Sequence, residues 1–168
     1  MDLLDEEVFA VILAITIVGS AIAIAQVVRP EITEPFNALG LLNEECKIGD
    51  YPRYVYPGGN LTLCIFLYNH RDYPALLQVR YKIGTNATLP TNTTPSPQPV
   101  LKVFEFLVGV KENVTKPITI PIAINESLKD KRIALIFELW IYDLEKKSWV
   151  YTGIWNHIYV DVVWMPLP

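Results

Sequence analysis

Hydrophobic residues run without a break near the start of the chain and alternate with polar residues over much of the remainder. Val8 to Val28 contains no charged residue, and an apolar helix of this length covers a hydrocarbon core of about 30 Å. Its weakly polar members, such as Thr16 and Ser20, are too few to form a polar face for water. Residues 8–28 therefore predict a transmembrane α-helix, preceded by an acidic lead over residues 1–7.

The pattern changes to a period of two residues in the C-terminal part, which we expect to be the folded domain, residues 53–168. Ala75 to Ile83 and Arg132 to Tyr142 alternate most clearly between apolar and polar side chains, as half-buried strands do. Residues 29–52 contain three prolines and no sustained period, so they predict an extended juxtamembrane linker. The Thr-, Asn- and Pro-rich residues 84–99 predict a long exposed loop. About seven short strands predict an all-β fold, an immunoglobulin-like antiparallel β-sandwich.

Composition supports this fold and narrows the choice of partners. The chain of 168 residues has room for one domain of common size beside the helix, and 13 Pro, 9 Tyr and 4 Trp against 2 Met favour strands and turns. A net charge of −4 and a pI near 5.2 provide no basic surface, so nucleic acid is not expected as a partner.

The apolar helix has two readings, an anchor or a cleaved signal peptide. Ala23 to Ala25 has the small-x-small form of a signal-peptidase site, but Met1 to Glu7 contains four acids and no base, whereas a secretory n-region is positive. We therefore expect the helix to be retained as a single membrane span.

Two opposing observations bear on which side of the membrane the C-terminal domain lies. Arg29 alone would place the following domain on the cytoplasmic side by the positive-inside rule. Against it stand N-x-[ST] sequons, which predict N-linked glycans on an external domain, at Asn60, Asn86, Asn92, Asn113 and Asn125. We expect the cell membrane as the location, with the N-terminus cytoplasmic and the C-terminal domain extracellular.

The two cysteines favour a disulfide. Outside the cytosol an even pair such as Cys46 and Cys64 is usually oxidised, and a bridge closing a loop of this size contributes about 3 kcal/mol. The alternative is two separate thiols, with Cys64 simply buried in its strand.

A metal site is one interpretation of His70, His157, Cys64 and Met165, which are the residue types of a blue-copper centre. Such centres bring Cys, His and Met together within one C-terminal loop, whereas Cys64 lies in an early strand and no cysteine follows it. We therefore expect no metal and no other cofactor. His70 is expected to bond the turn from Asn69 to Tyr73, and His157 to face a tyrosine or solvent.

Enzymatic activity is also not expected. Glu105, Glu138 and Asp161 lie within apolar strands and resemble carboxylates for acid–base work, but outward-facing exposed positions explain them more simply. The chain contains no nucleophile elbow, no Gly-rich phosphate loop and no metal-ligand cluster motif.

One stretch carries a family resemblance. The run FNALGLLNEECKIGDYPRYVYPGGNLTLCIFLYNH, followed later by IFELWIYD and YTGIW, resembles an archaeal family of membrane proteins with extracytoplasmic sandwich domains. The similar region covers residues 36–159. The resemblance implies archaeal origin and a surface location, and it implies no activity.

These observations predict a non-enzymatic, glycosylated, single-span accessory or structural subunit of a cell-surface or membrane complex. Aromatic residues are enriched at interaction surfaces, and the C-terminal strand region holds a series of them, Trp149, Tyr151, Trp155, Tyr159 and Trp164. One alternative is a pilin-like filament subunit with the apolar helix in the filament core. Another is a sugar-binding adhesin that uses the exposed aromatic rings.

Overall fold

The computed structural model describes residues 5–28, 34–128 and 131–164, without the side chain of Glu126. The chain divides into two compact units, residues 1–34 and 35–168. Three sites of the sequence-based predictions lie outside the described residues: the acidic lead before Asp5, Arg29 and Met165. The second unit is the folded domain.

The first unit is a single helix, α1, Glu6–Val27, and none of its residues is buried. The Thr16 hydroxyl donates to the Ile12 carbonyl at 2.8 Å and the Ser20 hydroxyl to the Thr16 carbonyl at 2.7 Å, so both polar side chains are satisfied within the helix. By length and composition α1 can cross a membrane. Together with the disulfide described below, it indicates secretion or membrane association.

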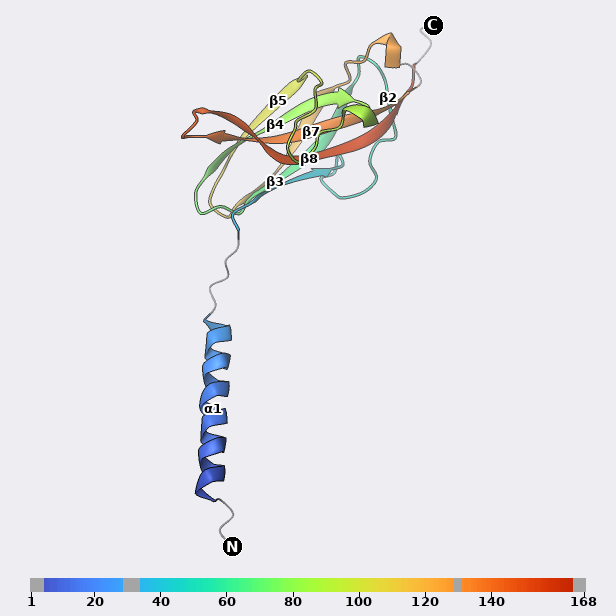
Figure 1. The fold of residues 1–168 in the computed structure, drawn as a ribbon. Helices are drawn as coiled ribbons and strands as arrows, with labels where there is room; N and C mark the ends of the chain where they lie inside the picture. Colours follow the sequence, from blue (N-terminus) through green and yellow to red (C-terminus); the bar gives the residue numbers. More distant parts are fainter. Residues whose placement is uncertain (1–4, 29–33, 129–130, 165–168) are drawn as a thin grey trace. The chain divides into compact units, whose positions relative to one another are not determined.

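The second unit is a mainly-β sandwich of two sheets (Figure 1). A three-stranded sheet has the order β1 (Asn37–Leu42), β3 (Asn60–Asn69), β6 (Asn113–Pro121). A five-stranded sheet has the order β2 (Tyr54–Val55), β8 (Ser148–Val162), β7 (Arg132–Asp143), β4 (Ala75–Gly84), β5 (Lys102–Val108). Two short 3₁₀ helices, η1 (Asn86–Thr88) and η2 (Glu126–Leu128), lie in the connections. The all-β sandwich predicted from the sequence is thus confirmed as a fold class.

Alternation along the strands builds the core between the sheets. The inward positions of β4 and β7 are buried, and the rings of Tyr81 and Phe137 lie 5.3 Å apart there. Leu63, Ile65 and Leu67 of β3 close the core from the opposite sheet. Strand β6 contains Pro117 and Pro121 and lies at the edge of its sheet, as proline in a strand requires.

Three details differ from the prediction. Residues 37–42, expected to lie in a linker, form β1, which pairs antiparallel with β3 and buries Leu41; the run is too short and too apolar to show a period. The described residues contain eight strands rather than about seven. The sandwich is also not wholly antiparallel, because β2 pairs in parallel with the end of β8.

Cys46 and Cys64 form the predicted disulfide, with 5.1 Å between their Cα atoms. The bridge joins the loop after β1 to the middle of β3, and it removes the thiolate that a copper site would need.

The turn after β3 was expected to be bonded by His70, but the buried Asn69 bonds it instead. The Asn69 side-chain amide donates to the carbonyls of Tyr73, Val108 and Gly109. His70 instead shares a 2.9 Å hydrogen bond between its Nδ1 and the Tyr68 hydroxyl.

Candidate interaction face

Aromatic side chains line the outer face of the five-stranded sheet, on the side away from the core. On β8 they occupy alternate positions, and on β7 they stand directly opposite. The ring pairs are Trp140 with Tyr151 at 5.5 Å, Tyr142 with Trp149 at 5.4 Å, Trp155 with His157 at 5.3 Å and His157 with Tyr159 at 4.8 Å. We call these seven residues the aromatic face. Because all of them are half-buried, each keeps part of its ring open to a partner.

Two arginines lie over this face. The Arg80 guanidinium is 3.8 Å from the centre of the Trp140 ring, and that of Arg132 is 5.0 Å from the Tyr159 ring. Burial lowers the pKa of Arg80, and the nearby Glu138 carboxylate opposes that shift. Gln78 accepts a hydrogen bond from Arg80 Nε at 2.6 Å and donates one to Glu105 at 2.9 Å. The side chains of Arg80 and Gln78 on β4 are therefore linked to Glu105 on β5.

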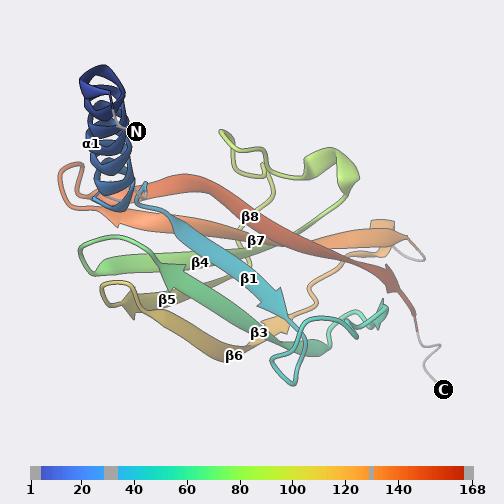
Figure 2. The same cartoon turned by 90° about the horizontal axis from the view of Figure 1, so that it is seen from below.

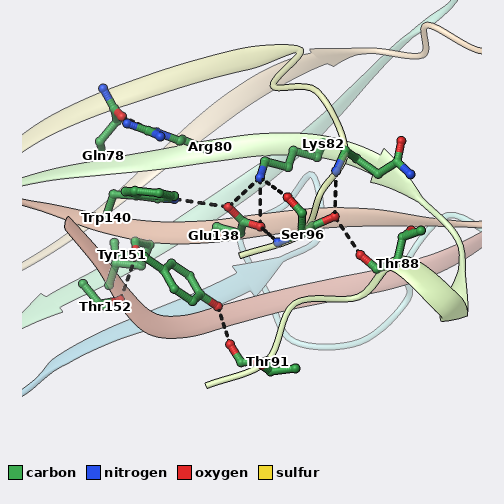
Figure 3. Close-up of polar contacts among 12 residues, drawn as sticks. Gln78, Arg80, Lys82, Thr88, Thr91, Ser96, Glu138, Trp140, Tyr151 and Thr152 are labelled. Carbon is green, nitrogen blue, oxygen red and sulfur yellow. Dashed lines mark hydrogen bonds and ion pairs between the residues drawn. The ribbon is translucent and has the colours of Figure 1, made fainter. Parts of the chain in front are cut away.

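A buried ion pair lies on the same outer face of the sheet, beside Trp140 (Figure 3). Lys82 Nζ is 3.0 Å from Glu138 Oε2 and 3.1 Å from Oε1, and both side chains are almost completely buried. Glu138 also accepts from the Ser96 backbone N–H at 2.6 Å and from Trp140 Nε1 at 3.2 Å, while Lys82 donates to the Ser96 carbonyl at 2.7 Å. These bonds compensate for removing two charges from water.

The long connection between β4 and β5, residues 85–101, folds back over this pair; we call it the cover loop. The Tyr151 hydroxyl donates to the Thr91 carbonyl at 2.8 Å and the Tyr159 hydroxyl donates to Asn86 at 2.8 Å. The Asn92 carbonyl packs against Gly153, where a Cβ atom would meet it at 2.2 Å. The loop was predicted to be long and exposed, but Pro90 and Ser96 are buried and its backbone is bonded to the sheet.

The structure brings together four of the five aromatic residues singled out from the sequence. Trp149, Tyr151, Trp155 and Tyr159 share the aromatic face, whereas Trp164 packs against the hydrophobic core. Burial raises the pKa of Tyr151 to about 12, with a smaller contribution from Glu138. His157 lies between two rings of the face, as expected for a residue facing tyrosine, and burial lowers its pKa.

The three acidic residues that the sequence analysis singled out differ in burial. Glu105 and Asp161 are exposed, as predicted, but Glu138 is fully buried, so its placement on an exposed face was wrong. The β4 face bearing Gln78 and Lys82 was also predicted to be wet, and both are buried. Among the described residues, no group of three or more His, Cys, Asp or Glu side chains is placed to hold a metal ion.

The predicted glycosylation sites all lie at the surface. The exposed asparagines are Asn60, Asn86, Asn92, Asn113 and Asn125. Asn86 and Asn92 belong to the cover loop and border the aromatic face, because Asn86 is bonded to Tyr159 and Asn92 contacts Gly153.

Sequence reasoning missed Trp140, Tyr142 and His157 as members of the aromatic face, although the alternation of β7 and β8 contained the information. It also missed Lys82 with Glu138. These two residues lie on diagonal positions of neighbouring strands, since Lys82 pairs with Ile136 and Glu138 with Arg80. That juxtaposition depends on the register between β4 and β7, which alternation within one strand does not specify.

Comparisons with known proteins bear on the fold. No protein-family model and no curated protein sequence matches the chain. A CARDB domain from Pyrococcus furiosus, crystallised in complex with di-metal ions, is similar over 77% of this chain and 89% of its own, with 13% identity and a TM-score of 0.47.

Parts of larger enzymes are similar to a comparable degree. An alkylpurine DNA glycosylase of Pseudomonas fluorescens matches with 13% identity and a TM-score of 0.42, over 75% of this chain and 30% of its own. A β-glucosidase of Listeria innocua matches with 11% identity and a TM-score of 0.43, over 77% of this chain and 16% of its own. These are distant structural similarities, the first of them to a CARDB domain, and they identify no family for this chain.

Proposed function

We propose that the protein is a non-enzymatic, single-span membrane protein whose sandwich domain lies outside the cell and serves as an accessory or structural subunit of a surface or membrane complex. In this proposal the aromatic face contacts a partner protein. The face carries the proposal, because it gathers two tryptophans and two tyrosines of one strand, with further rings from β7 and two arginines. Trp, Tyr and Arg are the residues that dominate binding energy at interfaces.

The anchor and the location are supported by separate features. Helix α1 has no buried residue and satisfies its own hydroxyl groups, as a lipid-facing helix must. The disulfide suits an oxidising compartment. The exposed sequons are compatible with N-linked glycans on the same side.

Chemical crosslinking in native membranes, followed by purification in mild detergent, tests this function. Trp155→Ala and Trp149→Ala should weaken partner recovery by about 30-fold each if they are hot spots, since about 2 kcal/mol is typical of such residues. Tyr54→Ala is the matched control, because Tyr54 is an aromatic residue on β2, is 60% exposed and lies outside the aromatic face. A protein that stays monomeric and alone, or equal losses in all three variants, would contradict the proposal.

The sugar-binding alternative rests on the same rings, because aromatic faces can stack on sugar rings. A glycan array probed with the full chain distinguishes it. Binding of a defined glycan that Trp155→Ala abolishes, without any crosslinked protein, would favour the adhesin.

A further inference from the structure

A second exposed surface lies at one end of the sandwich. Figure 2 shows that the β3–β4 loop, the β5–β6 loop and the β7–β8 hairpin gather at the end where β1 begins. Six exposed apolar or aromatic side chains belong to the elements at this end, with Leu144 at the hairpin tip 81% exposed and Leu107 72% exposed. The others are Phe36, Tyr73, Leu76 and Val110. We call these six residues the tether-end surface, because Phe36 is where the chain from the helix enters the domain.

The tether-end surface is hollowed into a groove rather than flat. Tyr73, Leu76, Leu107 and Leu144 line it together with Ile141, Arg71 and Tyr142, and Tyr142 also belongs to the aromatic face. Arg71 of the groove follows His70 in the chain, and the His70 backbone N–H donates to the Phe36 carbonyl at 2.9 Å while the His70 ring stacks on Phe36 at 4.8 Å.

The charges around the groove are balanced. Arg71 donates to the Tyr73 hydroxyl at 2.6 Å, Lys111 lies 3.4 Å from Asp72, and Lys146 lies 3.8 Å from Asp143. A strongly basic rim would indicate an anionic surface. Mixed charges around apolar and aromatic side chains instead suit zwitterionic groups, with the tyrosine ring at the boundary between apolar and wet layers.

Chain length limits what can cover this surface. Only residues 29–36 separate Val28, after the end of α1, from the start of β1. Eight residues span at most about 28 Å when fully extended. With α1 in a membrane, the chain between the end of the helix and the start of β1 could therefore span no more than this length.

We propose that the tether-end surface docks on the bilayer, with Leu107 and Leu144 entering the interfacial layer of zwitterionic phospholipids. The inference rests on the retained anchor of the proposed function. It goes further, because it assigns lipid as the partner of this end and leaves the rest of the aromatic face, beyond Tyr142, open to proteins.

The test uses the full chain in phosphatidylcholine nanodiscs, with a nitroxide label at Leu144→Cys while the native disulfide stays oxidised. Relaxation by dissolved oxygen and by a water-soluble nickel chelate reports immersion. The matched control is Ile48→Cys, because Ile48 is 87% exposed and follows the other end of β1. Accessibility to nickel should be several-fold lower at residue 144 than at residue 48, and accessibility to oxygen should be higher.

A second variant separates docking from local shielding. Replacing Leu107 and Leu144 together by Asp should return a label at Tyr73→Cys to full nickel accessibility, whereas Ile48→Asp should leave that label immersed. Equal nickel accessibility at residues 144 and 48 in protein retained by the discs would overturn the docking and leave the anchor intact. Protein that carbonate extracts from native membranes would overturn the anchor, and the docking with it.

Discussion

At the scale of single residues, the buried pair of Lys82 and Glu138 has a large energetic consequence. Each charged group has lost its water, and each is compensated by the other and by the backbone of Ser96. Such a pair adds little compared with apolar residues of the same volume, but breaking it is costly because one charge is left uncompensated.

Lys82→Met should therefore lower the free energy of unfolding by about 3 kcal/mol. The double variant Lys82→Met/Glu138→Gln should lose less than the single one, since no buried charge remains. Urea unfolding of the full chain in mild detergent measures both. Lys47→Met is the control: Lys47 pairs with Glu45 at 2.8 Å at the surface, and its loss should cost under about 1 kcal/mol. A single variant no worse than this control would contradict the role of the pair.

His157 should make stability depend on pH. Burial lowers its pKa in the folded protein below the ordinary value of 6.5, so the unfolded chain takes up the proton first as the pH falls. The contribution of neutral His157 to the free energy of unfolding is complete above pH 6.5 and is lost as the pH drops below that value. The unfolding temperature should fall between about pH 7 and pH 5, and His157→Gln should flatten that slope. An unchanged slope in the variant would assign the dependence to other groups.

At the scale of elements, the cover loop converts an open sheet face into a partly buried one. It carries the backbone N–H and C=O of Ser96 to the ion pair and is bonded to β8 through Tyr151 and Tyr159. Gly153, with φ of +78°, gives the loop room, because Asn92 lies where a side chain would be.

Gly153→Ala should displace the cover loop as well as strain β8. The φ alone costs about 1–2 kcal/mol for a residue with a Cβ atom, and the clash with Asn92 adds to it. Limited proteolysis should then cut within residues 85–101 faster than in the native chain. Gly58→Ala is the matched control, with φ of +74° and nothing within 4 Å of the added Cβ. Equal cleavage rates in the two variants would show that the contact does not hold the loop.

The elements differ in how far the sequence predicts them. Strands β4 and β7 follow from alternation because one face of each is fully buried, and the disulfide follows from the number and setting of the cysteines. Strand β1 was missed because Asn37–Leu42 is short and its pairing with β3 is decided by tertiary contacts. The cover loop was missed because its bonds use backbone groups of Thr91 and Ser96, which leave no mark on residue type.

At the scale of the whole molecule, the distribution of surfaces fits a domain with two contacts. The aromatic face lies on the outer side of the five-stranded sheet, and the tether-end surface lies at the end where the chain enters. The sequons add a third constraint, because a glycan and a protein partner compete for space where they are adjacent. Asn86 and Asn92 are the two sequons that border the aromatic face.

Glycans at these sequons would report on which side of the membrane the domain lies. Asn86 or Asn92, and also Asn113, should carry a sugar in protein isolated from its native host, since these side chains are exposed and a bulky group there disturbs no core packing. The intact mass should exceed that of the polypeptide, at least one of Asn86→Gln and Asn92→Gln should remove a glycan, and Asn113→Gln should remove another. Asn43→Gln is the control, because Asn43 is outside any sequon and its loss should leave the glycan mass unchanged. A mass equal to the bare chain would remove the main support for an external domain, and Arg29 would then favour the cytoplasmic side.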